Sequence, residues 1–379
     1  MRLHLSVVCL MVLPAFFGCD DGAAPYDPCQ GVSQNGVCVG ENSFKWCEVV
    51  AEKKPEIKTK DCLVYESCKI VGVEARCVLK ADRCLPGATK CDGAKIGNCN
   101  ATGNWEFTDC ATGCREMAIA AYCDSGIATA DYSSKLKYMA RDIDTTTMNR
   151  WGDPFEVFPA GVLVVSISGD KIVESARTGV GGAFTIKVPS AIKAGDALMF
   201  LAARPVTGKS GVGVSLAVGN PKMASEGKNS TNDIAAAKGT IWSWKFDLLA
   251  TPPDAYLITE ENLSGIMRMF DWENQLLTAA EAQWPSVPSL PLAIWMQPNV
   301  SWDCGACAWD QDNSIGALVF NRNIVSEMTV VNQQFWSRAV FAHEFGHYVM
   351  SVWGVSPMEG GKHCLSSHYP PGLVWSEGW

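Results

Sequence analysis

Cysteine placement constrains this fold more than any other feature of the sequence. Twelve of the 17 cysteines fall between Cys29 and Cys123, in two similar sets of six, each opening with Asp-x-Cys. Segments this short and polar cannot bury much apolar surface, so disulfides would have to stabilise them. The pattern predicts two copies of one disulfide-rich repeat, at 29–78 and 79–124, and leaves the pairing open. A zinc cluster is the weaker alternative, because closely spaced cysteine pairs and histidines are absent there.

The N-terminus indicates export. Arg2 precedes a short apolar run from Leu5 to Phe17, which predicts a signal peptide at 1–18 and is too short to span a bilayer. Gly18-Cys19 resembles the lipobox of bacterial lipoproteins, which implies that Cys19 carries a lipid and that 19–28 is a linker. The alternative is a plain secretory signal. Both alternatives predict a protein of the cell envelope, lipid-anchored or secreted, in an oxidising compartment.

Composition excludes some partners and divides the rest of the chain. The net charge of -9 argues against nucleic-acid binding, and any membrane contact is expected through the lipid alone. Residues 125–152 are polar and mixed, which predicts a linker. Short β-rich runs separated by Gly and Asp turns follow in 153–250 and predict a small β-sandwich. Their order resembles the carboxypeptidase regulatory-like modules of secreted enzymes.

The last part of the chain, 251–379, is expected to be an α+β domain. Apolar spacing predicts a helix capped by Thr259 and ended by Pro285, then strands at 291–296 and 315–320. A second, mostly apolar helix is predicted from Asn332 to Gly354. Together with the N-terminal segments, the predicted fold class is multidomain: disulfide-rich repeats, a β-sandwich and an α+β domain.

The second helix carries His343-Glu344-Phe345-Gly346-His347. Positions i and i+4 lie on one helix face, so both imidazoles can bind one metal ion. Glu344 would lie beside the metal, where it can accept a proton from a water that Zn²⁺ has acidified. Buried histidines without such a role would carry a cost, so the pattern predicts a zinc-dependent hydrolase.

Catalytic zinc needs a third protein ligand, and the candidates lie downstream. The spacing of the metzincin peptidases is excluded, because their glycine and histidine positions are Met350 and Trp353 here. Trp375-Ser376-Glu377-Gly378 resembles the third-ligand segment of the gluzincins, particularly the aminopeptidase N-like peptidases. The resemblance implies Glu377 as the third ligand and a zincin-type catalytic domain. His363 and His368 remain alternatives.

The same comparison bears on the substrate. The resembled aminopeptidases carry an amine-binding glutamate on an edge strand before the zinc helix, whereas the comparable strand here, Gly316 to Asn321, has Val319 at that position. An edge strand can still pair with an extended peptide. An endopeptidase acting on peptides or proteins is therefore expected, with an aminopeptidase as an alternative. A further alternative is a non-catalytic surface protein whose repeats bind a ligand.

Two expectations concern the remaining cysteines and the chain end. Cys304 and Cys307 are expected to form a structural disulfide, which leaves Cys364 over. Trp379 ends the sequence two residues after Glu377, where a ligand would be poorly held. The sequence therefore predicts a catalytic domain that is incomplete at its C-terminus, as in an N-terminal fragment of a longer product.

Overall fold

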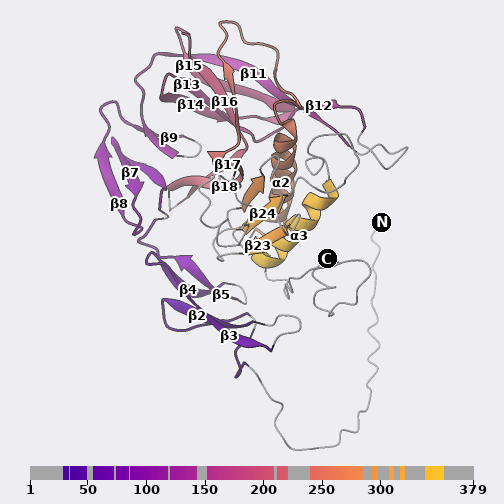
Figure 1. The fold of residues 1–379 in the computed structure, drawn as a ribbon. Helices are drawn as coiled ribbons and strands as arrows, with labels where there is room; N and C mark the ends of the chain where they lie inside the picture. Colours follow the sequence, from indigo (N-terminus) through magenta and orange to yellow (C-terminus); the bar gives the residue numbers. More distant parts are fainter. Residues whose placement is uncertain are drawn as a thin grey trace, which may run out of the picture.

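The computed structural model describes the chain in ten stretches. They are 29–48 without 34, 54–71, 74–117 without 85, 120–142, 152–220 without 209 and 210, 240–285, 292–296, 307–310, 316–320 and 338–353. In these stretches the protein is mostly β-strand in several sheets, with two α-helices (Figure 1). The expectation of disulfide-rich β-structure is confirmed. The predicted signal peptide at 1–18, Cys19, Cys304 and the segment after Trp353 lie outside the described residues.

Each cysteine repeat is built from short strands that pair antiparallel with one another. The first repeat contains β1 (Val37–Cys38), β2 (Ser43–Glu48), β3 (Glu56–Asp61), β4 (Glu66–Val71) and β5 (Glu74–Leu79). The second contains β6 (Thr89–Asp92), β7 (Lys95–Cys99), β8 (Trp105–Asp109), β9 (Cys114–Met117) and β10 (Ala120–Cys123). In the first repeat only a few side chains are buried together, among them Phe44 and Ala75. Covalent cross-links must therefore supply much of its stability.

All twelve cysteines of the array are in disulfides, with the same pairing in both sets. The first cysteine pairs with the third, the second with the fifth and the fourth with the sixth. The bonds are Cys29–Cys47, Cys38–Cys68 and Cys62–Cys77, then Cys84–Cys99, Cys91–Cys114 and Cys110–Cys123. A zinc cluster in this array is excluded, because thiols in disulfides cannot ligate metal. The shared pairing is what two copies of one module would have.

Two sheets pack face to face after the repeats. One contains β12 (Phe155–Val157), β11 (Thr129–Ala140), β15 (Ala183–Pro189) and, beside β11, β21 (Tyr256–Ile258). The other has the order β14 (Lys171–Arg177), β13 (Leu163–Ser168), β16 (Ala197–Leu201), β20 (Ser243–Asp247). Phe184 of the first sheet meets Phe200 of the second edge to face, with ring centroids 5.5 Å apart. The strands expected in 153–250 thus form most of this sandwich.

The expectation of a linker at 125–152 must be corrected, because this segment contains the long strand β11. This strand pairs with β12, β15 and β21, and Tyr132, Leu136 and Tyr138 are buried in the core. Alternate residues face the core, so the exposed Asp, Ser and Lys between them give the segment its polar composition. The high average polarity of this segment therefore concealed the alternation of buried and exposed residues that marks a strand.

A third, mixed sheet supports the C-terminal part of the chain. Its order is β23 (Cys307–Asp310), β24 (Gly316–Phe320), β22 (Leu292–Met296), β18 (Gly211–Asn220), β6, β7, β8, with β17 (Ala203–Gly208) and β19 (Thr240–Ile241) also beside β18. Strands β18, β22 and β24 run parallel, whereas β23 is antiparallel to β24. The strands predicted at 291–296 and 315–320 are confirmed, while β17, β18 and β23 were not predicted.

Helix α2 (Ser264–Gln283) joins the sandwich to this third sheet. It begins later than the predicted cap at Thr259, because residues 259–263 form a turn in which Leu263 has φ +62°. Its end before Pro285 is as predicted. One hydrophobic cluster runs from the sandwich across α2 to β22 and helix α3 (Arg338–Trp353). The packing is thus continuous across the expected domain boundary at 250.

A buried polar group fastens α2 to β11. The Tyr138 hydroxyl donates to Asp271 Oδ2 over 2.8 Å and accepts a bond from Arg268 Nη1 at 3.3 Å. Arg268 also stacks on Trp272, 4.0 Å from the ring centroid, and Gln275 donates to Asp271. Burial is the main reason that the pKa of the Tyr138 hydroxyl is raised well above its usual range. The hydroxyl therefore stays protonated as the donor to Asp271.

Tyr138→Phe should lower the free energy of unfolding by about 1–3 kcal/mol, since a buried carboxylate loses a donor. Urea unfolding at pH 7 measures the change. Tyr132→Phe is the matched control, because the Tyr132 hydroxyl bonds only the neutral hydroxyl of Tyr256, at 2.6 Å, among the interactions described. Its expected cost is about 1 kcal/mol. Equal costs for the two variants would contradict the importance of the Asp271 contact.

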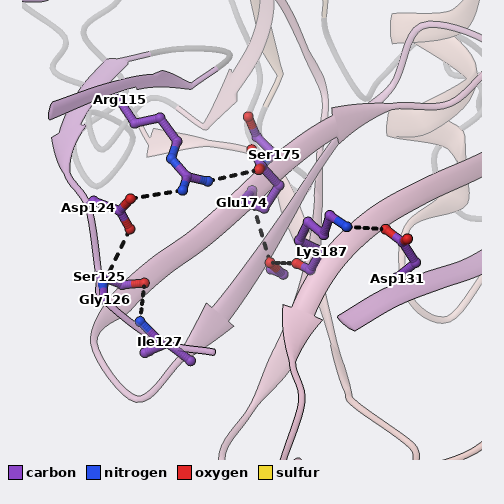
Figure 2. A network of polar contacts seen from close by, with 10 residues as sticks. Arg115, Asp124, Ser125, Gly126, Ile127, Asp131, Glu174, Ser175 and Lys187 are labelled. Carbon is purple, nitrogen blue, oxygen red and sulfur yellow. Dashed lines mark hydrogen bonds and ion pairs between the residues drawn. The ribbon is translucent and has the colours of Figure 1, made fainter. Parts of the chain in front are cut away.

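The second cysteine repeat is also tied to the sandwich. Arg115 on β9 donates from Nη2 to Asp124 at 2.8 Å and from Nη1 to Glu174 on β14 at 3.0 Å (Figure 2). Thr89 of β6 pairs with Val212 of β18 in the third sheet. The repeat is therefore held at two places and not by a flexible tether alone.

Acid should loosen this attachment. The backbone N–H of Gly126 and, secondarily, the Arg115 guanidinium lower the pKa of the Asp124 carboxyl. Such a carboxyl stabilises the fold fully above its unfolded-state pKa of about 3.9, and the contribution is lost as pH falls through the lower folded-state value. Amide exchange of 113–126 should therefore speed up below about pH 4 in wild type relative to Asp124→Asn. The same pH dependence in both proteins would show that Asp124 is not responsible.

Candidate metal centre

Helix α3 presents the predicted zinc-binding residues. Phe341, Phe345, Tyr348 and Val349 recur at helical spacing and are buried, so they orient the helix on the core. The ring centroids of Phe341 and Trp272 of α2 are 5.3 Å apart. Figure 1 shows α3 beside α2 and the strands β23 and β24. This packing fixes the helix rotation that brings His343 and His347 to one side.

The two imidazoles converge. His343 Nε2 and His347 Nε2 are 3.3 Å apart, and the rings are nearly perpendicular, with an interplanar angle of 84°. Two nitrogens bound at about 2.0–2.1 Å to a tetrahedral zinc ion lie about 3.3 Å from each other. His347 is buried and His343 is exposed, so the pair borders on solvent. The geometry of this donor pair fits zinc.

Glu344 lies on the same helix between the two histidines and is 5% exposed. Burial and then the charge of Glu344 raise the pKa of the Glu273 carboxyl, on α2, well above its ordinary range. Nearby, burial raises the pKa of the Tyr348 phenol above its ordinary value, and the charge of Glu281 raises it further. Glu281 is itself paired with Arg204 at 2.7 Å. The buried side of α3 is therefore rich in acidic groups.

The predicted site is brought together in part. The structure places His343, Glu344 and His347 on one helix, and no group of three His, Cys, Asp or Glu side chains able to hold a metal occurs among the described residues. Glu377, His363 and His368 lie outside these residues, so the third ligand stays a prediction.

The prediction of which strand forms the sheet edge near helix α3 must be corrected. The sequence pointed to 316–321, but β24 is flanked by β23 on one side and β22 on the other. Among the described strands, the antiparallel strand β23 forms the edge of the sheet, in a segment where the sequence predicted no strand. Backbone pairing of Cys307 with Val319 and of Asp310 with Gly316 defines its register.

Glu273 was not predicted as part of the site. It is 0% exposed in α2 and lies one helical turn from Phe270 and from Leu277. A glutamate at this place in an apolar stripe was the available signal, since charged groups are rarely buried without a role.

Comparisons of this chain with family models, with curated proteins and with solved structures find no match.

Proposed function

We propose that this chain is an exported zinc metallopeptidase that cleaves peptide bonds within a chain. His343 and His347 hold the metal and Glu344 is the general base. The 3.3 Å separation of the two Nε2 atoms carries the proposal, because it matches two ligands of one tetrahedral ion. Six disulfides indicate an oxidising compartment, and no helix among the described residues is long and apolar enough to cross a bilayer.

The protein groups would divide the chemistry between them. When bound, zinc acidifies a water molecule and polarises the peptide carbonyl. Glu344 takes the proton from the attacking water and passes it to the leaving nitrogen. The imidazoles of His343 and His347 bind through Nε2, the atoms that converge here. Glu377 is proposed as the third ligand, with His363 and His368 as alternatives, and Cys19 as the lipid attachment point.

Strand β23 supplies a place for an extended substrate. It is the outer strand of the third sheet, and in the described part of the chain nothing pairs with its outer side. It also lies against α3. A peptide added to this edge would pair through its backbone, which does not require a free terminus. This arrangement favours an endopeptidase over an aminopeptidase.

Metal content and cleavage test the proposal together. Protein expressed with its natural signal and any downstream residues of its reading frame should contain one zinc per chain and cut peptides with blocked ends. Chelation should abolish cleavage, and zinc should restore it. Release of single residues from free N-termini only would favour an aminopeptidase. Protein without zinc or cleavage would overturn the proposal.

The first cysteine repeat favours a second candidate, a non-catalytic surface-binding protein. Several of its large apolar side chains are exposed: Val37, Val39, Leu63, Val64 and Ile70. Exposed apolar groups on one small module are typical of a binding surface. If the protein lacks zinc, this function becomes the better account of the chain.

A further inference from the structure

A cleft of about 620 Å³ opens on the β-sandwich, and none of its lining residues belongs to helix α3. Strand β11 contributes residues 133–135 to the lining, and strand β15 contributes residues 183–185. Arg177 at the end of β14, Gly179 and the segment 252–254 before β21 complete it. Ligand sites in proteins commonly measure about 300–1,000 Å³, so this cleft is large enough for a ligand of several bonded groups and not only for a simple ion.

Local contacts hold the walls of this cleft in place. Ser134 Oγ donates to the Pro253 carbonyl over 2.6 Å, which ties the segment before β21 to strand β11. In the turn before β15, Gly182 has φ +68° and lies so close to the Leu136 carbonyl that a Cβ at this position would collide with it. Only glycine therefore allows the turn to approach β11. The cleft is formed without a ligand, which lowers the cost of binding one.

The cross-strand pairs on the exposed face of β11 and β15 leave one lysine without a carboxylate. Asp131 is opposite Lys187, and their side chains form an ion pair of 2.8 Å (Figure 2). Lys135, four residues farther along β11, is opposite Ala183, and its ammonium forms no ion pair with any described residue. Lys135 lines the cleft. One charge of this face is therefore matched within the sheet, whereas the charge at the cleft is not.

Arg177 brings a second cation to the cleft. Its Nη2 donates to the Pro205 carbonyl at 2.7 Å, which anchors the guanidinium, and no carboxylate of the described residues pairs with it. Burial, and then the charge of Arg204, lower the pKa of Arg177, and a bound anion would offset both effects. Asp254 is the one carboxylate among the lining residues. The lining thus has a positive balance in a chain whose net charge is -9.

The uncharged part of the lining favours a peptide as the carrier of the anion. Ser133 Oγ and Thr185 Oγ1 are 2.8 Å apart on the exposed face, and such hydroxyls can bond the amide groups of a main chain. Pro252 and Pro253 add apolar surface. A sugar ring would need an exposed aromatic face on which to stack, but Phe184, the one aromatic residue of the lining, is only 5% exposed.

We propose that this cleft binds an acidic peptide segment: Lys135 and Arg177 pair with its carboxylates, and the hydroxyls of Ser133 and Thr185 bond its main chain. Two charge-assisted contacts supply affinity for the carboxylates, and the surrounding polar groups select a polypeptide. The partner is a protein that exposes a segment rich in Asp and Glu. The inference does not depend on the proposed peptidase function, because no lining residue belongs to α3.

Fluorescence anisotropy with the full-length protein tests this site. The probe is a labelled, end-blocked peptide of alternating Glu and Gly, and the comparison is its Gln-Gly analogue, which has the same length without charge. Phenanthroline is present so that no zinc-dependent cleavage occurs. The Glu peptide should bind at low salt, bind more weakly as the ionic strength rises, and exceed the affinity of the Gln peptide by at least about tenfold.

Matched variants assign the binding to the cleft. Lys135→Gln should weaken binding of the Glu peptide by about 3- to 10-fold, and it breaks no ion pair among the described residues. Arg177→Gln should weaken binding at least as much. Lys187→Gln removes the same charge from the same sheet face but outside the cleft, and should stay within about twofold of wild type. An equal loss in Lys187→Gln overturns the inference. Equal binding of the two peptides, no binding of the Glu peptide, or binding of an oligogalacturonate in its place overturns it as well.

Discussion

Glu344→Gln should reduce peptide cleavage by about 10²- to 10⁴-fold while the protein keeps one zinc ion per chain. The amide has nearly the shape of the carboxylate but cannot accept the proton of the attacking water. The two Nε2 atoms, 3.3 Å apart, are not altered by this change. Cleavage of a peptide with blocked ends and metal analysis of the same sample measure the two effects.

Two controls make this result specific. Glu281→Gln is the same chemical change on the neighbouring helix and should leave cleavage within about twofold of wild type. His347→Ala should lose zinc and cleavage together. Cleavage close to wild type in Glu344→Gln would rule out its role as general base.

Loss of the Cys38–Cys68 bond should have the largest effect on stability. The bond closes a sequence separation of 30 residues, and chain entropy assigns about 3.5 kcal/mol to such a closure. Among its described residues, the repeat has two small clusters of buried side chains, around Phe44 and around Val32, to offset that loss. We expect the Cys38→Ser/Cys68→Ser protein to have an unfolded first repeat. Limited proteolysis should cut within 29–78.

The equivalent bond of the second repeat is the matched control. Cys91–Cys114 joins the same ordinal positions over 23 residues, so the entropic term is nearly equal. This repeat is also held by Arg115 and by the pairing of Thr89 with Val212. The Cys91→Ser/Cys114→Ser protein should therefore resist protease better. Equal cutting of both repeats would show that those attachments contribute little.

Sequence patterns predicted local features well where one periodicity dominated. The Gly- and Asp-bounded runs became β13 to β16, and the cysteine spacing predicted the disulfide-rich repeats, whose shared pairing came from the structure alone. Helical spacing of apolar residues likewise predicted the helix α3 that carries His343. These features depend on neighbouring residues, so a single sequence contains enough information to find them.

Features that depend on distant partners were missed. Strand β11 was hidden by its polar outward face, and β23, with four residues, is too short to show a clear alternation. Glu273 is buried in α2, which packs against α3 from far away along the chain. Neither periodicity nor spacing reports which residues meet in three dimensions. The helix that carries the histidines could therefore be predicted, but its packing against α2 and the glutamate buried there could not.

The pairing of β11 has a consequence for biogenesis. Its Tyr138 reaches Asp271, 133 residues later, and Tyr132 reaches Tyr256, 124 residues later. Contacts between residues so far apart in the sequence give this core a high contact order, and closing such long loops is slow. After crossing the membrane, the disulfide repeats can fold at once from local contacts, while β11 must wait exposed until α2 has followed. Chaperone dependence during secretion should accordingly concentrate on the β11 segment and not on the cysteine repeats.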